Sequence, residues 1–240
     1  MADPIYQFKI KELIPLEIFE TNISYTNSSL FMSLSIILVS LLLLVSIKKK
    51  SLVPSRLQSV SEIFYEFIAN MVSDNIGDKG HKFFPLIFTL FTFLLFGNML
   101  GMLPYSFTFT SHIIVTFVLA MFVFLLVTLL GIFIHGFKFF GLFVPKGVPM
   151  VMLPLMIPIE IISYLSRPIS LSVRLFANMM AGHTMLKIFA GFIVPLGIFG
   201  IAPLMVDVAL TALEVLIAFL QAYVFTILTC LYLNEAINLH

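Results

Sequence analysis

The longest apolar segment without a clear turn begins at residues 150–189, which read MVMLPLMIPIEIISYLSRPISLSVRLFANMMAGHTMLKIF. A second stretch, residues 192–233, follows it as FIVPLGIFGIAPLMVDVALTALEVLIAFLQAYVFTILTCLYL. Each is about twice as long as the ~20 residues that a helix needs to cross a bilayer. Neither contains a clear central turn, although Pro154, Pro158 and Pro168 should bend the first. We therefore expect a hairpin of two long helices that cross the membrane at a strong tilt.

The composition of the whole chain indicates a membrane protein. Of 240 residues, 60% are hydrophobic and 10% are charged, and the mean hydropathy is +1.12. Soluble domains are about 45–50% apolar and about 25% charged, so this composition excludes a soluble enzyme. The net charge of +1 excludes an electrostatic preference for nucleic acid, and the single cysteine, Cys230, excludes an internal disulfide. No P-loop pattern G-x-x-x-x-G-K-[ST] occurs, so the chain has no recognisable nucleotide site.

Three shorter apolar runs, residues 30–47, 83–103 and 113–134, are each long enough to span a bilayer. The second contains Gly97-x-x-x-Gly101, a spacing that allows close contact with another helix. Residues 55–75 instead alternate apolar side chains with Glu62 and Glu66 at helical spacing. This pattern predicts an amphipathic helix that is too polar to span and lies along the inner membrane surface.

The basic residues predict the orientation. With five membrane-embedded helices, all eight Lys and Arg residues from Lys48 to Lys146 fall on one side, which the positive-inside rule makes the inner side. The N-terminus is then outside and the C-terminus inside. We expect an all-α integral membrane protein in three parts: an outer segment (residues 1–29), three spans with the surface helix 55–75 (residues 30–149), and the tilted hairpin (residues 150–240).

The hairpin carries ionisable side chains at membrane depth. A central Arg or Asp costs about 2.5–3.5 kcal/mol on insertion scales, so such residues need partners or water and are candidates for function. The set comprises Glu160, Arg167, Arg174, His183, Lys187, Asp207 and Glu214.

Helical spacing sorts these side chains into faces. Glu160, Arg167 and Arg174 recur every seven residues, so they share a face to within roughly 40°. Asn178 stands four residues after Arg174 and lies beside it. His183 stands nine residues after Arg174 and points in about the opposite direction.

The last helix carries a polar stripe of Asp207, Glu214 and Gln221, again at intervals of seven. Carboxyl and imidazole groups can gain and lose protons, whereas a guanidinium stays charged in proteins. A fixed cation between titratable groups attracts a carboxylate and blocks proton hopping. The pattern therefore favours proton handling.

Structural roles remain open for several of these residues. Arg167 and Lys187 are expected near helix ends, with their charges extended to the interface. Asp207 can form a structural pair or cap the last helix, and His183 can be a hydrogen-bonded core histidine. No pair of histidines has metal-ligand spacing, and we expect neither a metal nor a cofactor.

Residues 170–183, SLSVRLFANMMAGH, resemble the signature of the F-type ATP synthase subunit a family, and residues 214–225 resemble its last helix. The resemblance extends over essentially the whole chain. It implies a membrane stator that faces a ring of c subunits, contacts the b subunits of the peripheral stalk, and has no catalytic site of its own. Protons, or alternatively Na⁺, would enter one half-channel, load a rotor carboxylate and leave by a second half-channel.

The resemblance also implies roles for individual residues. Arg174 matches the essential arginine between the half-channels, and Asn178 matches its polar neighbour. The residues that match the lining of the proton paths are Glu160, His183, Glu214 and Gln221. Asn98 matches a path position more loosely, and Asp207 is a further candidate.

Two departures from the family pattern are informative. Many bacterial members carry an acid in place of His183 and a histidine in place of Glu214, so the pair is exchanged here. The exchange resembles the alphaproteobacterial and mitochondrial branch, and we favour a bacterial inner membrane over a mitochondrial one. Gly101 stands where some members have an acid, so we expect no strong role for it.

Two other classes of protein were weighed. A secondary transporter that binds an anion through an intramembrane Arg would have an internal repeat and broken helices, and the sequence shows no two-fold repeat. A purely structural scaffold would not need Arg, Glu and His within its apolar helices.

Overall fold

The computed structural model describes residues 8–15, 17–18, 21–22, 24–48, 55–103, 106–143 and 152–238. Its helices are α1 (Asn27–Lys48), α2 (Arg56–Ile76), α3 (Phe84–Gly101), α4 (Ile113–His135), α5 (Leu153–Ile193) and α6 (Ile201–Ile237). Of the basic residues that predict orientation, Lys49, Lys50 and Lys146 lie outside the described residues, as do residues 150–151 of the hairpin.

The segment before α1 contains four short strands. β1 (Glu12–Ile14) pairs antiparallel with β4 (Tyr25–Thr26), and β2 (Glu17–Ile18) pairs antiparallel with β3 (Thr21–Asn22). The sequence did not predict these strands, which are only two or three residues long.

The described residues confirm an all-α membrane protein. Four segments are long and apolar enough to cross a membrane, namely Asn27–Ser46, Gly80–Gly101, Ile113–Phe139 and Gly197–Ile237. α5 is not among them, because its 41 residues include Glu160, Arg167, Arg174 and Lys187. The fifth membrane-embedded helix is thus the one that carries most of the unusual charge.

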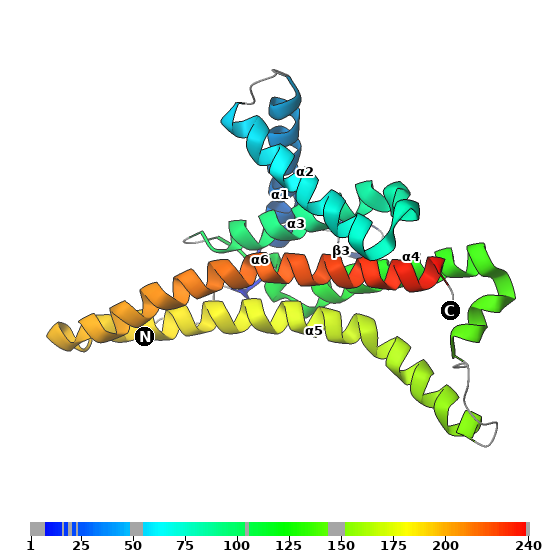
Figure 1. Ribbon diagram of the computed structural model, residues 1–240. Coiled ribbons are helices and arrows are strands. Elements are labelled where there is room, and N and C mark those ends of the chain that lie inside the picture. The colour runs from blue at the N-terminus through cyan, green and yellow to red at the C-terminus, as the bar shows by residue number, and fades with distance from the viewer. Residues whose placement is uncertain are drawn as a thin grey trace.

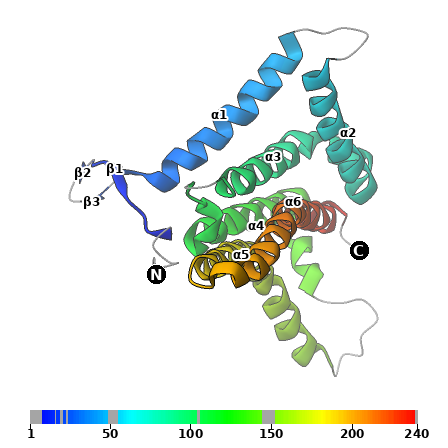
Figure 2. The ribbon, with the colours of Figure 1, turned by 90° about the vertical axis from the view of Figure 1, so that its left-hand side faces the viewer.

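α5 and α6 form a hairpin, as predicted. They lie side by side and run across the direction of α1 (Figures 1 and 2). α5 bends away from α6 toward its N-terminal end (Figure 1), and Pro158 and Pro168 lie inside this helix. A proline inside a helix removes one backbone hydrogen bond and introduces a kink.

The turn of the hairpin lies later than the sequence suggested. The expected helices left only residues 190–191 between them, whereas the structure turns between Ile193 and Ile201 and extends α6 to Ile237. Gly197 has φ +56°, a conformation that side chains disfavour, and a Cβ on Gly200 would lie 2.3 Å from the Ile193 carbonyl oxygen. These glycines permit a turn that hydropathy does not reveal.

α2 is the predicted amphipathic helix. Its N-cap, Ser55, accepts a hydrogen bond from the Gln58 amide, and the helix buries Ile68, Met71, Val72 and Ile76. This face packs on α3 and α6 and belongs to the apolar core that unites α3, α4, α5 and α6.

Candidate functional site

A buried acid and a buried histidine meet between the two hairpin helices. His183 of α5 is 8% exposed and Glu214 of α6 is 2% exposed, and His183 Nδ1 contacts Glu214 Oε1 directly. Buried charges are costly unless they are paired, so this contact holds two of the predicted path residues together.

Gly182 makes room for this contact. A Cβ at Gly182 would lie 2.9 Å from Glu214 Oε1, closer than side chains normally approach. The glycine before His183 therefore allows α5 to receive the carboxyl group of α6.

The loop after α3 supplies a third group. The Oγ1 of Thr108 lies 2.6 Å from His183 Nε2 and donates a hydrogen bond to the Gly101 carbonyl at 3.1 Å. A Cβ at Gly97 or Gly101 would collide with Phe109 or Thr108, at 2.3 Å and 2.5 Å. The predicted close approach at these glycines is therefore to this loop rather than to another spanning helix, and Gly101 makes room for Thr108 in this packing.

His183 faces an open cleft of about 630 Å³. The cleft lies between the end of α3, the end of α5 and the N-terminal segment, and Thr108, Lys9, Lys11 and Lys187 are among its lining residues. Lys9 and Lys11 belong to the segment that the sequence predicts to lie outside the membrane.

Residues 8–11, here called the N-terminal strap, cover one wall of the cleft. Phe8 is buried and stacks on the His183 ring, with centroids 6.4 Å apart and an interplanar angle of 20°. Asn27 holds the strap, because its side chain donates to the Lys9 carbonyl and accepts from the Lys11 amide, both at 3.2 Å.

The strap also reaches His112, the residue before α4. Burial lowers the pKa of His112, and a backbone hydrogen bond with Phe8 partly opposes this shift. Phe107 stacks on His112 at 5.1 Å. His112 is therefore part of the packing around the strap.

Asn98 joins three elements in the interior. It is fully buried, donates to the Ala218 carbonyl of α6 at 3.2 Å and accepts from Thr110 Oγ1 at 2.9 Å. Gln221 is also buried and lies on the side of α6 that carries Glu214 and Ala218. These contacts give Asn98 a structural role.

Arg174 lies on another side of the hairpin. It is exposed, whereas His183 on the same helix is buried, and among the described residues no carboxylate forms an ion pair with Arg174. Glu160, Asn178 and Asp207 are half-buried. The structure thus brings His183 and Glu214 together but keeps Arg174 apart from them.

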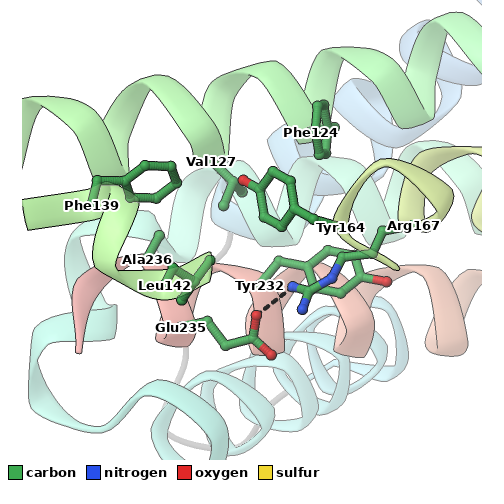
Figure 3. Close-up of a pocket in the computed structure, with 9 residues that line it drawn as sticks. All are labelled: Phe124, Val127, Phe139, Leu142, Tyr164, Arg167, Tyr232, Glu235 and Ala236. Carbon is green, nitrogen blue, oxygen red and sulfur yellow. Dashed lines mark hydrogen bonds and ion pairs between the residues drawn. The ribbon is translucent and has the colours of Figure 1, made fainter. Parts of the chain in front are cut away.

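Arg167 forms an ion pair with the end of α6. Its Nη1 bonds Glu235 Oε2 of α6, and its guanidinium lies 5.2 Å from the Tyr164 ring centroid and 4.9 Å from that of Tyr232 (Figure 3). Tyr164 hydroxyl and Thr128 Oγ1 are 2.7 Å apart, which ties α4 to the same group. The cavity here encloses only about 10 Å³, so this group, here called the inner clasp, is packed rather than open.

Sequence reasoning did not find Phe8, Thr108 or Glu235. Phe8 lies in the strap and Thr108 in a loop, and no local signal distinguishes either from its neighbours, because each contacts His183 far along the chain. Glu235 does continue the interval of seven from Glu214 and Gln221, but it lies beyond residue 233, where the last helix was expected to end.

Comparison with known proteins identifies the family of the chain. Residues 29–234 match the family model described as ATP synthase A chain. Proteins named "ATP synthase subunit a" are similar over the full length: that of Rhodospirillum rubrum is 55% identical over 100% of both chains, and that of Pelagibacter ubique is 56% identical over 100% of this chain and 99% of its own. That of Mesorhizobium japonicum is 56% identical over 99% of this chain and 97% of its own.

These relatives are alphaproteobacterial, the branch that the exchanged His183 and Glu214 indicated. α5 and α6 are also continuous, unlike the broken helices expected of the transporter alternative. The chain therefore belongs to the ATP synthase A chain family, whose members are non-catalytic subunits of the membrane sector of the ATP synthase.

Proposed function

We propose that this chain is a proton-conducting stator with two aqueous half-channels. One half-channel delivers protons from outside to a rotor carboxylate, the other releases them inside, and Arg174 separates the two. Proton flow through the chain then drives rotation, and ATP is made elsewhere in the complex.

The observation that carries this proposal is the cleft that ends at His183. An open cavity of about 630 Å³ reaches an imidazole that contacts the buried carboxyl group of Glu214. Water in the cleft can bring a proton to His183, and the imidazole can exchange it with Glu214. The carboxyl group of Glu214 lies between α5 and α6, within the hairpin that would face the rotor.

The position of Arg174 supports a separating role. Its guanidinium is exposed on α5, on a face that also exposes Ser170 and Ala177. An uncompensated cation on an apolar helix needs a partner, and a rotor carboxylate is the partner that fits. Because arginine stays protonated, it attracts a passing carboxylate but relays no proton.

The assignment of partners and location follows from the same proposal. The exposed apolar sides of α5 and α6 would face a ring of c subunits, b subunits would pack elsewhere on the chain, and lipid would cover the rest. The favoured location is a bacterial inner membrane, with the N-terminus outside, the C-terminus inside and H⁺ as the transported ion. One charge crossing 100 mV releases about 2.3 kcal/mol, which a leak between the half-channels would waste.

The proposal is tested by Arg174→Ala in inverted membrane vesicles that contain the whole ATP synthase. We expect ATP synthesis driven by an imposed proton gradient to be abolished, while the subunit still co-purifies with the oligomeric c ring. Ser170→Ala, which changes an exposed residue one turn away, is the matched control and should keep normal synthesis. Full ATP synthesis with Arg174→Ala would refute the separating role.

A further inference from the structure

We propose that Thr108 is a positioning residue. Its hydroxyl group is a hydrogen-bond partner for His183 Nε2 both when Nε2 carries a proton and when it does not. The His183–Glu214 pair can then gain and lose one proton without movement of heavier atoms. This inference rests on the proposed function, because it concerns how protons enter the same pair.

The hydroxyl group of Thr108 has two possible partners within reach. His183 Nε2 lies at 2.6 Å and the Gly101 carbonyl oxygen at 3.1 Å. A hydroxyl donates one hydrogen bond and accepts up to two, and its proton can rotate. Thr108 can therefore donate to Nε2, or donate to the carbonyl and accept from Nε2.

These two orientations correspond to two states of the pair. In the unloaded state, the imidazole of His183 is neutral and the carboxyl group of Glu214 is ionised. Thr108 then donates a hydrogen bond to Nε2, and Nδ1–H donates one to the Glu214 carboxylate. In the loaded state, a proton from water in the cleft is bound to Nε2, which donates to Thr108 Oγ1, and the hydroxyl proton turns to the Gly101 carbonyl. The pair has gained one proton and every polar hydrogen in both states has an acceptor.

Hydrogen bonds within the loop fix the position of Thr108. The Ser106 hydroxyl donates to the Gly101 carbonyl at 2.7 Å, and the Ser111 hydroxyl donates to the Thr108 carbonyl at 2.6 Å. Thr108 is 4% exposed, and the missing side chain of Gly101 lets it pack on the end of α3. With Thr108 at Nε2, Glu214 at Nδ1 and Phe8 on its face, the imidazole ring has one orientation.

The loaded state depends more strongly on Thr108. A hydrogen bond from a charged imidazolium is about twice as strong as one between neutral groups, so loss of the hydroxyl disfavours loading. The outer pH at which proton flux is half-maximal should then be lower than in the natural protein by roughly one unit. Among the described residues, the titratable or charged groups around the pair are Asp207 from α6, Lys187 from α5, Lys9 and Lys11 from the strap, and His112 beyond Phe8. A change at Thr108 alters none of these side chains.

The test measures passive proton flux through the membrane sector against outer pH, in vesicles from which the catalytic sector has been stripped. Thr108→Val keeps the shape and removes the hydroxyl, and should move the half-maximal pH roughly one unit lower and reduce flux several-fold at neutral pH. Thr108→Ser keeps the hydroxyl and should restore the normal profile. Thr116→Val is the matched control, since Thr116 is buried and bonds Ser172 of α5 at 3.1 Å but does not touch His183.

A normal pH profile for Thr108→Val, or an equal shift for Thr108→Ser, overturns the inference. If Thr108→Val is missing from the purified complex, Thr108→Ala, which removes the hydroxyl in a smaller side chain, is measured in its place. Glu214→Gln is measured in parallel: unchanged flux in that variant refutes the proposed path, whereas reduced flux with a normal Thr108→Val profile refutes only the role of Thr108.

Discussion

At the scale of single residues, Glu214 is the most constrained group in the hairpin. It is 2% exposed and its Oε1 contacts His183 Nδ1, but among the described residues neither Oε1 nor Oε2 accepts a hydrogen bond of ordinary geometry. A buried carboxyl group with an unused oxygen is costly to the fold. The position of this carboxyl group depends on the space left by Gly182.

Gly182→Ala should therefore disturb function more than folding. The added methyl group would displace the flexible end of Glu214 from His183, so we expect proton flux to fall about tenfold or more while assembly with the c ring persists. Passive flux in stripped vesicles is the measurement. Gly191→Ala, in the same helix but with open space around its Cβ, is the control and should behave normally. Equal flux in the two variants would contradict this account.

At the scale of elements, two contacts hold the hairpin at its opposite ends. The N-terminal strap lies against His183 in the C-terminal half of α5, and the inner clasp joins α5 to α6 and α4 at Arg167. The clasp is partly open to solvent, since the Arg167 and Glu235 side chains are 20% and 41% exposed, so its ion pair contributes modestly. Its two aromatic rings add cation–π attraction.

Breaking the clasp should loosen the hairpin. We expect Arg167→Ala to lower the free energy of unfolding by about 1–2 kcal/mol, from the lost ion pair and ring contacts. A double-mutant cycle with Glu235→Ala measures the coupling energy between the Arg167 and Glu235 side chains. Its readout is thermal unfolding of the purified complex in detergent. If the decreases in unfolding free energy of the two single variants add up to that of the double variant, the two side chains do not interact and the clasp is not a stabilising unit.

Loosening the strap should expose His183. Asn27→Ala removes both side-chain bonds to the strap, so Phe8 should leave the imidazole more often. The rate at which diethyl pyrocarbonate modifies His183, followed by mass spectrometry in the intact complex, should rise several-fold. Asn75→Ala, which removes a side-chain bond within α2, is the control and should leave the rate unchanged. The same rate in Asn27→Ala would mean that the strap does not shield His183.

At the scale of the whole molecule, chemical labelling of single introduced cysteines tests the proposed orientation in the membrane. Cys230, the single cysteine of the chain, is fully buried, so the natural protein should react little with a membrane-impermeant maleimide. Lys9→Cys should be labelled in intact cells, and Lys82→Cys only in inverted vesicles, because the two exposed positions are predicted on opposite sides. Labelling of Lys82→Cys in intact cells would reverse the orientation.

Hydropathy and helical spacing are local properties of the chain, so the membrane class, the amphipathic α2 and the long hairpin could be predicted without coordinates. His183 and Glu214 could also be identified as candidates, since charge within an apolar helix is conspicuous. Their partners required the folded structure: Thr108 and Phe8 at His183, Glu235 at Arg167, and a loop rather than a helix at Gly97 and Gly101. These contacts join residues far apart in the chain, and side-chain hydrogen bonds and glycine-sized gaps arise only when the helices have packed.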